Sequence, residues 1–120
     1  MVAAEAAACG ALPLSAGHSG MAEVIATLAP ALPEELRPLV SFEIGPRAVE
    51  EIATKLVAWL TLDDAERERA RLALAKEAAR HYRWENVAKG VIAAAQGRLD
   101  ELQFPAQLWL LKIQNRSNLA

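Results

Sequence analysis

Four side chains near the start of the chain are of kinds that do chemistry in proteins: Glu5, Cys9, His18 and Glu23. Carboxylates and histidines bind metals or move protons, and a cysteine can act as a nucleophile. Glu5, His18 and Glu23 lack the local spacing of a metal site. No histidine is tied to Cys9 by spacing, so we expect it to be a small buried residue. The sequence therefore predicts no catalytic residue, no metal site and no cofactor.

Binding of a ligand remains open for the other three side chains. Glu5 is either a solvated helix glutamate or a ligand-binding carboxylate. His18 either touches a substrate or lies on the surface, and Glu23 either favours the positive end of a helix or binds a ligand. The small residues Gly17, Ser19 and Gly20 make a turn that could approach a ligand closely, although ordinary strand-to-helix turns use the same residues.

The elements that must position these residues are short. Val2–Ala8 is rich in alanine, the strongest helix former, and Gly10 is placed to end that helix. The apolar run Leu12–Leu14 predicts a strand buried in a parallel sheet, with a proline at its start where a missing N–H is tolerated. Ser19 then predicts the cap of a helix over Met21–Leu28.

Prolines break the pattern after residue 29 and leave a connector with one turn at Glu34–Arg37. Val40–Ile44 alternates in polarity and predicts a strand or extended segment. Ala48–Leu60 has apolar residues at three- and four-residue spacing, which predicts an amphipathic helix that packs through that one face. A further helix is expected to begin at a cap formed by Asp63 or Asp64.

The last part of the chain continues as helices. The helix after Asp64 has a thin apolar stripe, which we expect to be buried: Leu72, Ala75 and Ala79. Residues 81–83 interrupt it and are expected to serve in packing. A second helix follows over Trp84–Ala95, with the Trp84 ring covering the core, and ends at Gly97. The apolar segment Phe104–Ile113 then precedes a polar end.

Length and composition limit the classes of protein. The chain has 120 residues, which favours one domain, and a net charge of -2, which gives no basic face for nucleic acid. Its single cysteine excludes an internal disulfide and fits a reducing compartment. No apolar run is long enough to span a bilayer, and the alanine-rich start lacks the basic residues of a signal peptide. We expect a cytoplasmic location.

Several motifs, taken in order, resemble the nucleotide-sugar-binding edge of a retaining GT-B-fold glycosyltransferase of the group 1 type. That family has a Glu-x7-Glu pattern, then a Cys-Gly-x-Pro-Val-like segment, then a Gly-Gly-x-x-Glu turn. Glu5 fits the second glutamate. Residues 9–14, Cys-Gly-Ala-Leu-Pro-Leu, fit the segment, and residues 19–23, Ser-Gly-Met-Ala-Glu, fit the turn. Residues 82–88, Tyr-Arg-Trp-Glu-Asn-Val-Ala, look like the opening of the family's final helix.

The resemblance implies an α/β fold: an incomplete C-terminal Rossmann-like lobe of a GT-B fold, mostly helical with two or so short strands. It covers residues 1–100 as part of the nucleotide-sugar-binding lobe and leaves 101–120 as an apolar tail of unknown role. Glu5 would accept hydrogen bonds from the donor ribose, and a carboxylate can grip such a vicinal diol with both oxygens. The backbone amides of Met1 and Val2 would approach the donor phosphates, and Ser19 and Gly20 would line the site.

The first glutamate of the pattern would lie upstream of Met1, so the chain resembles a fragment whose parent transfers a sugar from a nucleotide-sugar donor to an acceptor. Holding two reactants together contributes about 7–11 kcal/mol to catalysis. Because the acceptor lobe is missing, we expect no transfer from these residues alone. With about two strands left, we expect exposed sheet edges and apolar helix faces, and hence self-association.

A second interpretation belongs to another class of protein. The chain could be a small helical protein-interaction module without catalytic activity. The apolar stripes over Ala48–Leu60 and Trp84–Ala95 would then pack together or against a partner helix, and Phe104–Ile113 would serve as a docking segment. A remnant without function is a third possibility.

Overall fold

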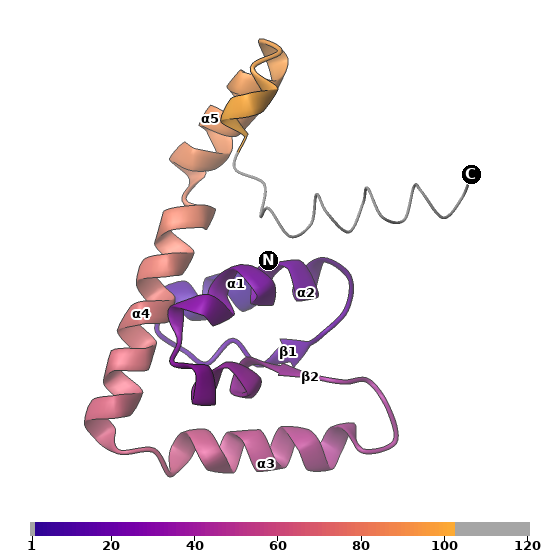
Figure 1. Ribbon diagram of the computed structural model, residues 1–120, viewed down its shortest axis with the longest axis vertical. Helices are drawn as coiled ribbons and strands as arrows, with labels where there is room; N and C mark the ends of the chain where they lie inside the picture. The colour runs from indigo at the N-terminus through magenta and orange to yellow at the C-terminus, as the bar shows by residue number, and fades with distance from the viewer. Residues whose placement is uncertain (1, 103–120) are drawn as a thin grey trace. The chain divides into compact units, whose positions relative to one another are not determined.

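A computed structural model describes residues 2–102 of the chain. Within this part the protein is mostly helical and contains one sheet of two short parallel strands, β1 and β2 (Figure 1). The chain divides into two compact units, Met1–Tyr82 and Arg83–Ala120. The expected division into 1–100 and 101–120 stays a prediction, because most of the second segment lies outside the described residues.

The first helix, α1, spans Val2–Ala8, as the sequence predicts. Gly10 ends it in the left-handed conformation, with φ at +75°. The N–H of Gly10 donates to the carbonyl of Ala7 at 2.9 Å, and that of Ala11 donates to Ala6 at 2.9 Å. This pair of bonds is the Schellman motif, which satisfies the last carbonyls of the helix.

The sheet belongs to a β-α-β unit. Strand β1 covers Ser15–Ala16, helix α2 covers Ser19–Leu28, and strand β2 covers Ser41–Phe42. The two strands are parallel, with Ser15 beside Ser41 and Ala16 beside Phe42. Two 3₁₀ helices, η1 (Ala29–Ala31) and η2 (Glu34–Val40), return the chain to β2. The connector therefore holds more regular structure than the single turn that was expected.

The first strand lies further along the chain than Leu12–Leu14, where we expected it. Pro13 has no N–H to donate to a ladder, and its side chain is fully buried in packing instead. Only Ser41 and Phe42 of the second strand run beside β1, so pairing is limited to two residues. The second strand itself falls within the predicted Val40–Ile44.

Helix α3 spans Ala48–Leu60, the bounds that the apolar pattern indicates, but its packing differs from the prediction. Trp59 is buried, whereas most of the expected packing face is exposed, including Val49, Leu56, Val57 and Leu60. The helix contacts β2 and η2, and its less exposed residues include Ile52, Lys55 and Trp59. The expectation of exposed apolar helix faces is therefore confirmed for α3 among the described residues.

Helix α4 spans Asp64–Tyr82. Asp63 caps it, because its carboxylate accepts the N–H groups of Ala65 at 2.9 Å and Glu66 at 3.3 Å. The buried stripe of this helix consists of Ala70, Leu74 and Ala78. It therefore differs from the predicted stripe of Leu72, Ala75 and Ala79. Small residues at two of the buried positions let α4 lie close to the alanines of α1, its main neighbour.

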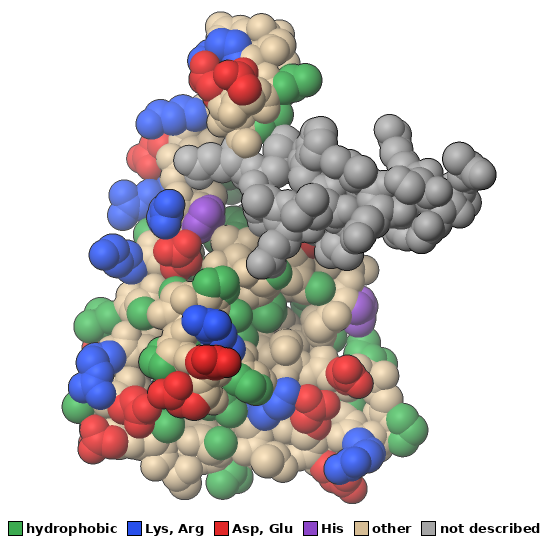
Figure 2. All heavy atoms as spheres, in the orientation of Figure 1, with side chains coloured by type: hydrophobic (Ala, Val, Ile, Leu, Met, Phe, Trp, Pro, Cys, Tyr) green, Lys and Arg blue, Asp and Glu red, His purple; other side chains and the backbone are tan. Residues whose placement is uncertain are grey.

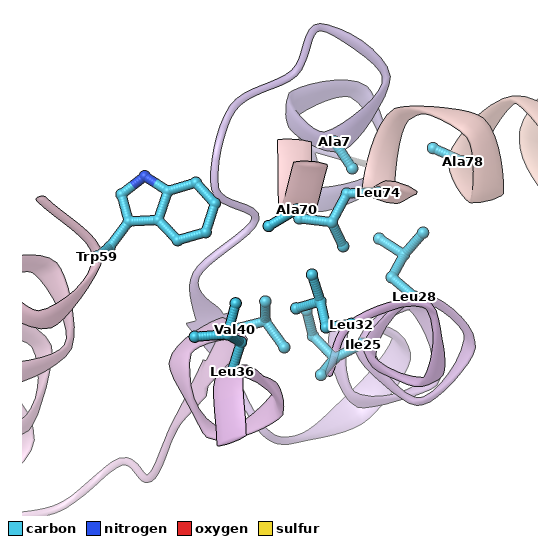
Figure 3. Close-up of a cluster of buried hydrophobic side chains, with 10 residues drawn as sticks. All are labelled: Ala7, Ile25, Leu28, Leu32, Leu36, Val40, Trp59, Ala70, Leu74 and Ala78. Carbon is cyan, nitrogen blue, oxygen red and sulfur yellow. The ribbon is translucent and has the colours of Figure 1, made fainter. Parts of the chain in front are cut away.

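The core of the first unit lies where α1, α2, η2 and α4 meet. Figure 3 shows Leu74 of α4 beside Ala7 and facing Leu28, Leu32 and Ile25. Val40 and Leu36 of η2 continue the cluster toward Trp59 of α3. The helices are thus held by one apolar cluster in which alanines fill the closest contacts.

The second unit contains helix α5, Trp84–Ala95, and the 3₁₀ helix η3, Leu99–Glu101. The break before α5 is confirmed, since α4 ends at Tyr82 and Arg83 is extended. Gly97, with φ at +73°, ends α5 as predicted. Trp84 is 82% exposed, so the expectation that its ring covers the core is wrong. Phe104–Ile113 lies outside the described residues.

Candidate functional site

The turn that joins β1 to α2 is held by backbone hydrogen bonds and contains a residue in the left-handed conformation. The N–H of Gly17 donates to the Phe42 carbonyl at 2.8 Å, and that of His18 donates back to Ala16 at 2.9 Å. Ser19 follows with φ at +54°; apart from glycines, no other described residue has a positive φ. This left-handed conformation costs about 1–2 kcal/mol for a residue with a side chain, and glycine adopts it freely.

We expected Ser19 to cap α2, but Ser19 is the first residue of that helix. His18 occupies the cap position and makes no side-chain cap hydrogen bond. Ser19 adopts its left-handed backbone where the chain turns from β1 into α2. The first N–H groups of α2 have no partners inside the helix, so they remain available to a ligand or water at this turn.

Helix α1 presents two of the predicted site residues on its outer side. Val2 and Glu5 are exposed and, being three residues apart, share one face, whereas Ala4 and Ala7 are buried. No described residue forms an ion pair or side-chain hydrogen bond with the Glu5 carboxylate. Met1, also predicted to lie in the site, falls outside the described residues.

An apolar hollow of about 330 Å³ lies between α1, β1 and the start of α2. Its lining comes from Val2, Ala3 and Ala6 of α1, residues 12–16, Met21 of α2 and Phe42 of β2. Of the predicted site residues in the described part of the chain, Val2 lines this apolar hollow. Glu5 lies one turn further along α1, and Ser19 and Gly20 directly precede Met21. The structure thus brings α1 and the turn to one region of the surface, with Glu5 outside the hollow.

Sequence reasoning missed Ser15, which also lines the apolar hollow. The residue is 8% exposed, and its hydroxyl oxygen is buried without a hydrogen-bond partner among residues 2–102. Buried polar groups in folded proteins nearly always have a partner, so this hydroxyl is an exception that needs one. The sequence carried no signal for it, because a serine after Leu14 also suits an ordinary turn.

A second, polar hollow of about 540 Å³ lies between the loop after β2 and the first turns of α3. The ammonium of Lys55 donates to Glu51 at 2.5 Å and also to the carbonyl of Ser41. The other Glu51 oxygen accepts the N–H of Glu43 at 3.2 Å. The hydrogen bond from Lys55 lowers the pKa of the Glu51 carboxyl, and the Glu43 N–H lowers it further.

These bonds tie the end of β2 and the loop at Glu43 to α3. Because the Lys55 ammonium and the Glu51 carboxylate are directed at each other, the arrangement serves to hold the loop. The sequence does contain its signal, a glutamate four residues before a lysine on one helix, which our sequence analysis did not use. Figure 2 shows acidic and basic side chains interspersed on the visible face, without a large basic patch.

The remaining predicted side chains lie apart from any cluster. Cys9 is exposed, contrary to the prediction, because it follows Ala7 by two residues and therefore points to the opposite side of the chain. His18 and Glu23 are exposed as well. His81, in the last turn of α4, contacts Glu77 at 2.8 Å. Among residues 2–102 no three potential metal ligands come together.

Comparison of the chain with protein-family models, with curated proteins and with solved structures gives no match. Over the described part of the chain, none of the helices combines the length and the apolar character that crossing a membrane requires.

Proposed function

We propose that the chain is the C-terminal part of the nucleotide-sugar-binding lobe of a retaining GT-B glycosyltransferase, an incomplete Rossmann-like lobe. The parent enzyme would transfer a sugar from a nucleotide-sugar donor to an acceptor. In support, β1, α2 and β2 form a parallel β-α-β unit, the building block of such lobes. Ligands of parallel α/β folds bind beyond the carboxyl ends of the strands, where the turn at 17–20 lies.

The observation that carries the proposal is the backbone of Ser19. Ser19 and Gly20 stand where the family pattern has Gly-Gly, and the first of these positions has φ at +54°. Glycine is the residue that this conformation favours, so the fold supplies a physical reason for a glycine at that position. This left-handed position in the turn supports the proposal, because a glycine motif would suit it.

The proposed donor would lie over the outer face of α1 and the turn. The Glu5 carboxylate would accept hydrogen bonds from both hydroxyls of the ribose, and Glu5 is exposed. The diphosphate would approach Met1 and Val2 at the start of α1, near Ser19 and Gly20. A charged hydrogen bond of this kind contributes about 1.5–3 kcal/mol to binding. No metal or other cofactor enters the proposal, since the nucleotide sugar is the substrate.

Transfer by residues 1–120 alone is not expected. A chain of this size is about one domain, and the proposed reaction needs a second lobe for the acceptor. The expected property is therefore weak binding of nucleoside diphosphates without turnover.

The test is an NMR titration of the chain with uridine diphosphate and with adenosine diphosphate. Amide shifts are expected at Val2, Glu5, Ser19 and Gly20. Glu5→Gln should weaken binding about ten- to a hundredfold. Glu35→Gln, which changes an exposed carboxylate on η2, is the matched control and should leave it unchanged. Absence of shifts at these residues up to about 5 mM nucleotide would contradict the proposal.

One observation favours the alternative, a helical interaction module without catalytic activity. Val49, Leu56, Val57 and Leu60 form an exposed apolar stripe along α3. Such a stripe is typical of a helix that packs on a partner. Sedimentation tests it. The Val57→Glu substitution should abolish self-association. The control Thr54→Glu, which changes an exposed polar residue of the same helix, should leave self-association intact. A wild-type chain that stays monomeric contradicts self-association through this stripe.

A further inference from the structure

We draw no further inference here: the strongest candidate, the exposed apolar side of helix α5 formed by Trp84, Val87, Val91 and Ile92, carries none, because nothing among the described residues 2–102 shows what covers it.

Discussion

Replacing Leu74 by alanine tests which face of α4 holds the first unit together. Leu74 is 0% exposed and lies at the centre of the apolar cluster, next to Ala7 of α1 (Figure 3). Truncating a buried leucine costs about 2–5 kcal/mol, and the cost rises by about 24 cal/mol for each Å³ of cavity that remains. Alanine neighbours have no side-chain freedom to fill the space. We therefore expect a loss of about 3–4 kcal/mol in the free energy of unfolding.

That loss is a large part of the whole. A unit of residues 1–82 is expected to have a free energy of unfolding of about 4–12 kcal/mol. The unfolding midpoint should fall by more than about 12 °C. The assay is urea unfolding followed by circular dichroism, with the dependence on urea concentration checked for a constant slope.

The matched control is Leu72→Ala, two residues earlier on the same helix. Leu72 is 61% exposed, so the change should stay within about 0.5 kcal/mol. A larger loss for Leu72→Ala than for Leu74→Ala would refute the packing described above. That result would mean that the buried stripe of α4 consists of Leu72, Ala75 and Ala79, as the sequence pattern predicts.

Three further predictions concern the backbone, a helix cap and a titrating group. Ser19→Gly should not destabilise the fold, because glycine adopts the left-handed φ of this position freely. Ser19→Val should lower the free energy of unfolding by about 1–2 kcal/mol relative to Ser19→Gly, which thermal unfolding of both variants measures. Asp63→Ala should lower the free energy of unfolding by about 1 kcal/mol through loss of the α4 cap, while Asp63→Asn preserves it; equal losses would contradict the cap. The folded pKa of Glu51 lies below its ordinary value, so its contribution to stability is present above the unfolded pKa and is lost as the pH falls through the folded one. Glu51→Gln should therefore reduce the acid dependence of the unfolding midpoint, and an unchanged pH profile would contradict the interaction with Lys55.

The candidate site could be predicted only in part. Val2, Glu5, Ser19 and Gly20 were named because the sequence resembles a glycosyltransferase motif, and the structure places them on α1 and at the start of α2. The role of each stays a prediction. The apolar hollow and the orphaned Ser15 hydroxyl could not be foreseen, because both depend on residues from α1, β1, α2 and β2 meeting in space. The polar contact between Glu51 and Lys55 was readable from their spacing alone.

The sequence by itself determined where most helices begin and end. Gly10 and Gly97 end helices because they adopt a left-handed backbone at little cost, and Asp63 begins one because its carboxylate accepts nearby N–H groups. These are local interactions, complete within a few residues. The tertiary structure decided which faces are buried, where β1 starts and why Ser19 is left-handed. Burial and strand pairing depend on neighbours distant in the chain, such as α1 against α4 and Ser41 beside Ser15.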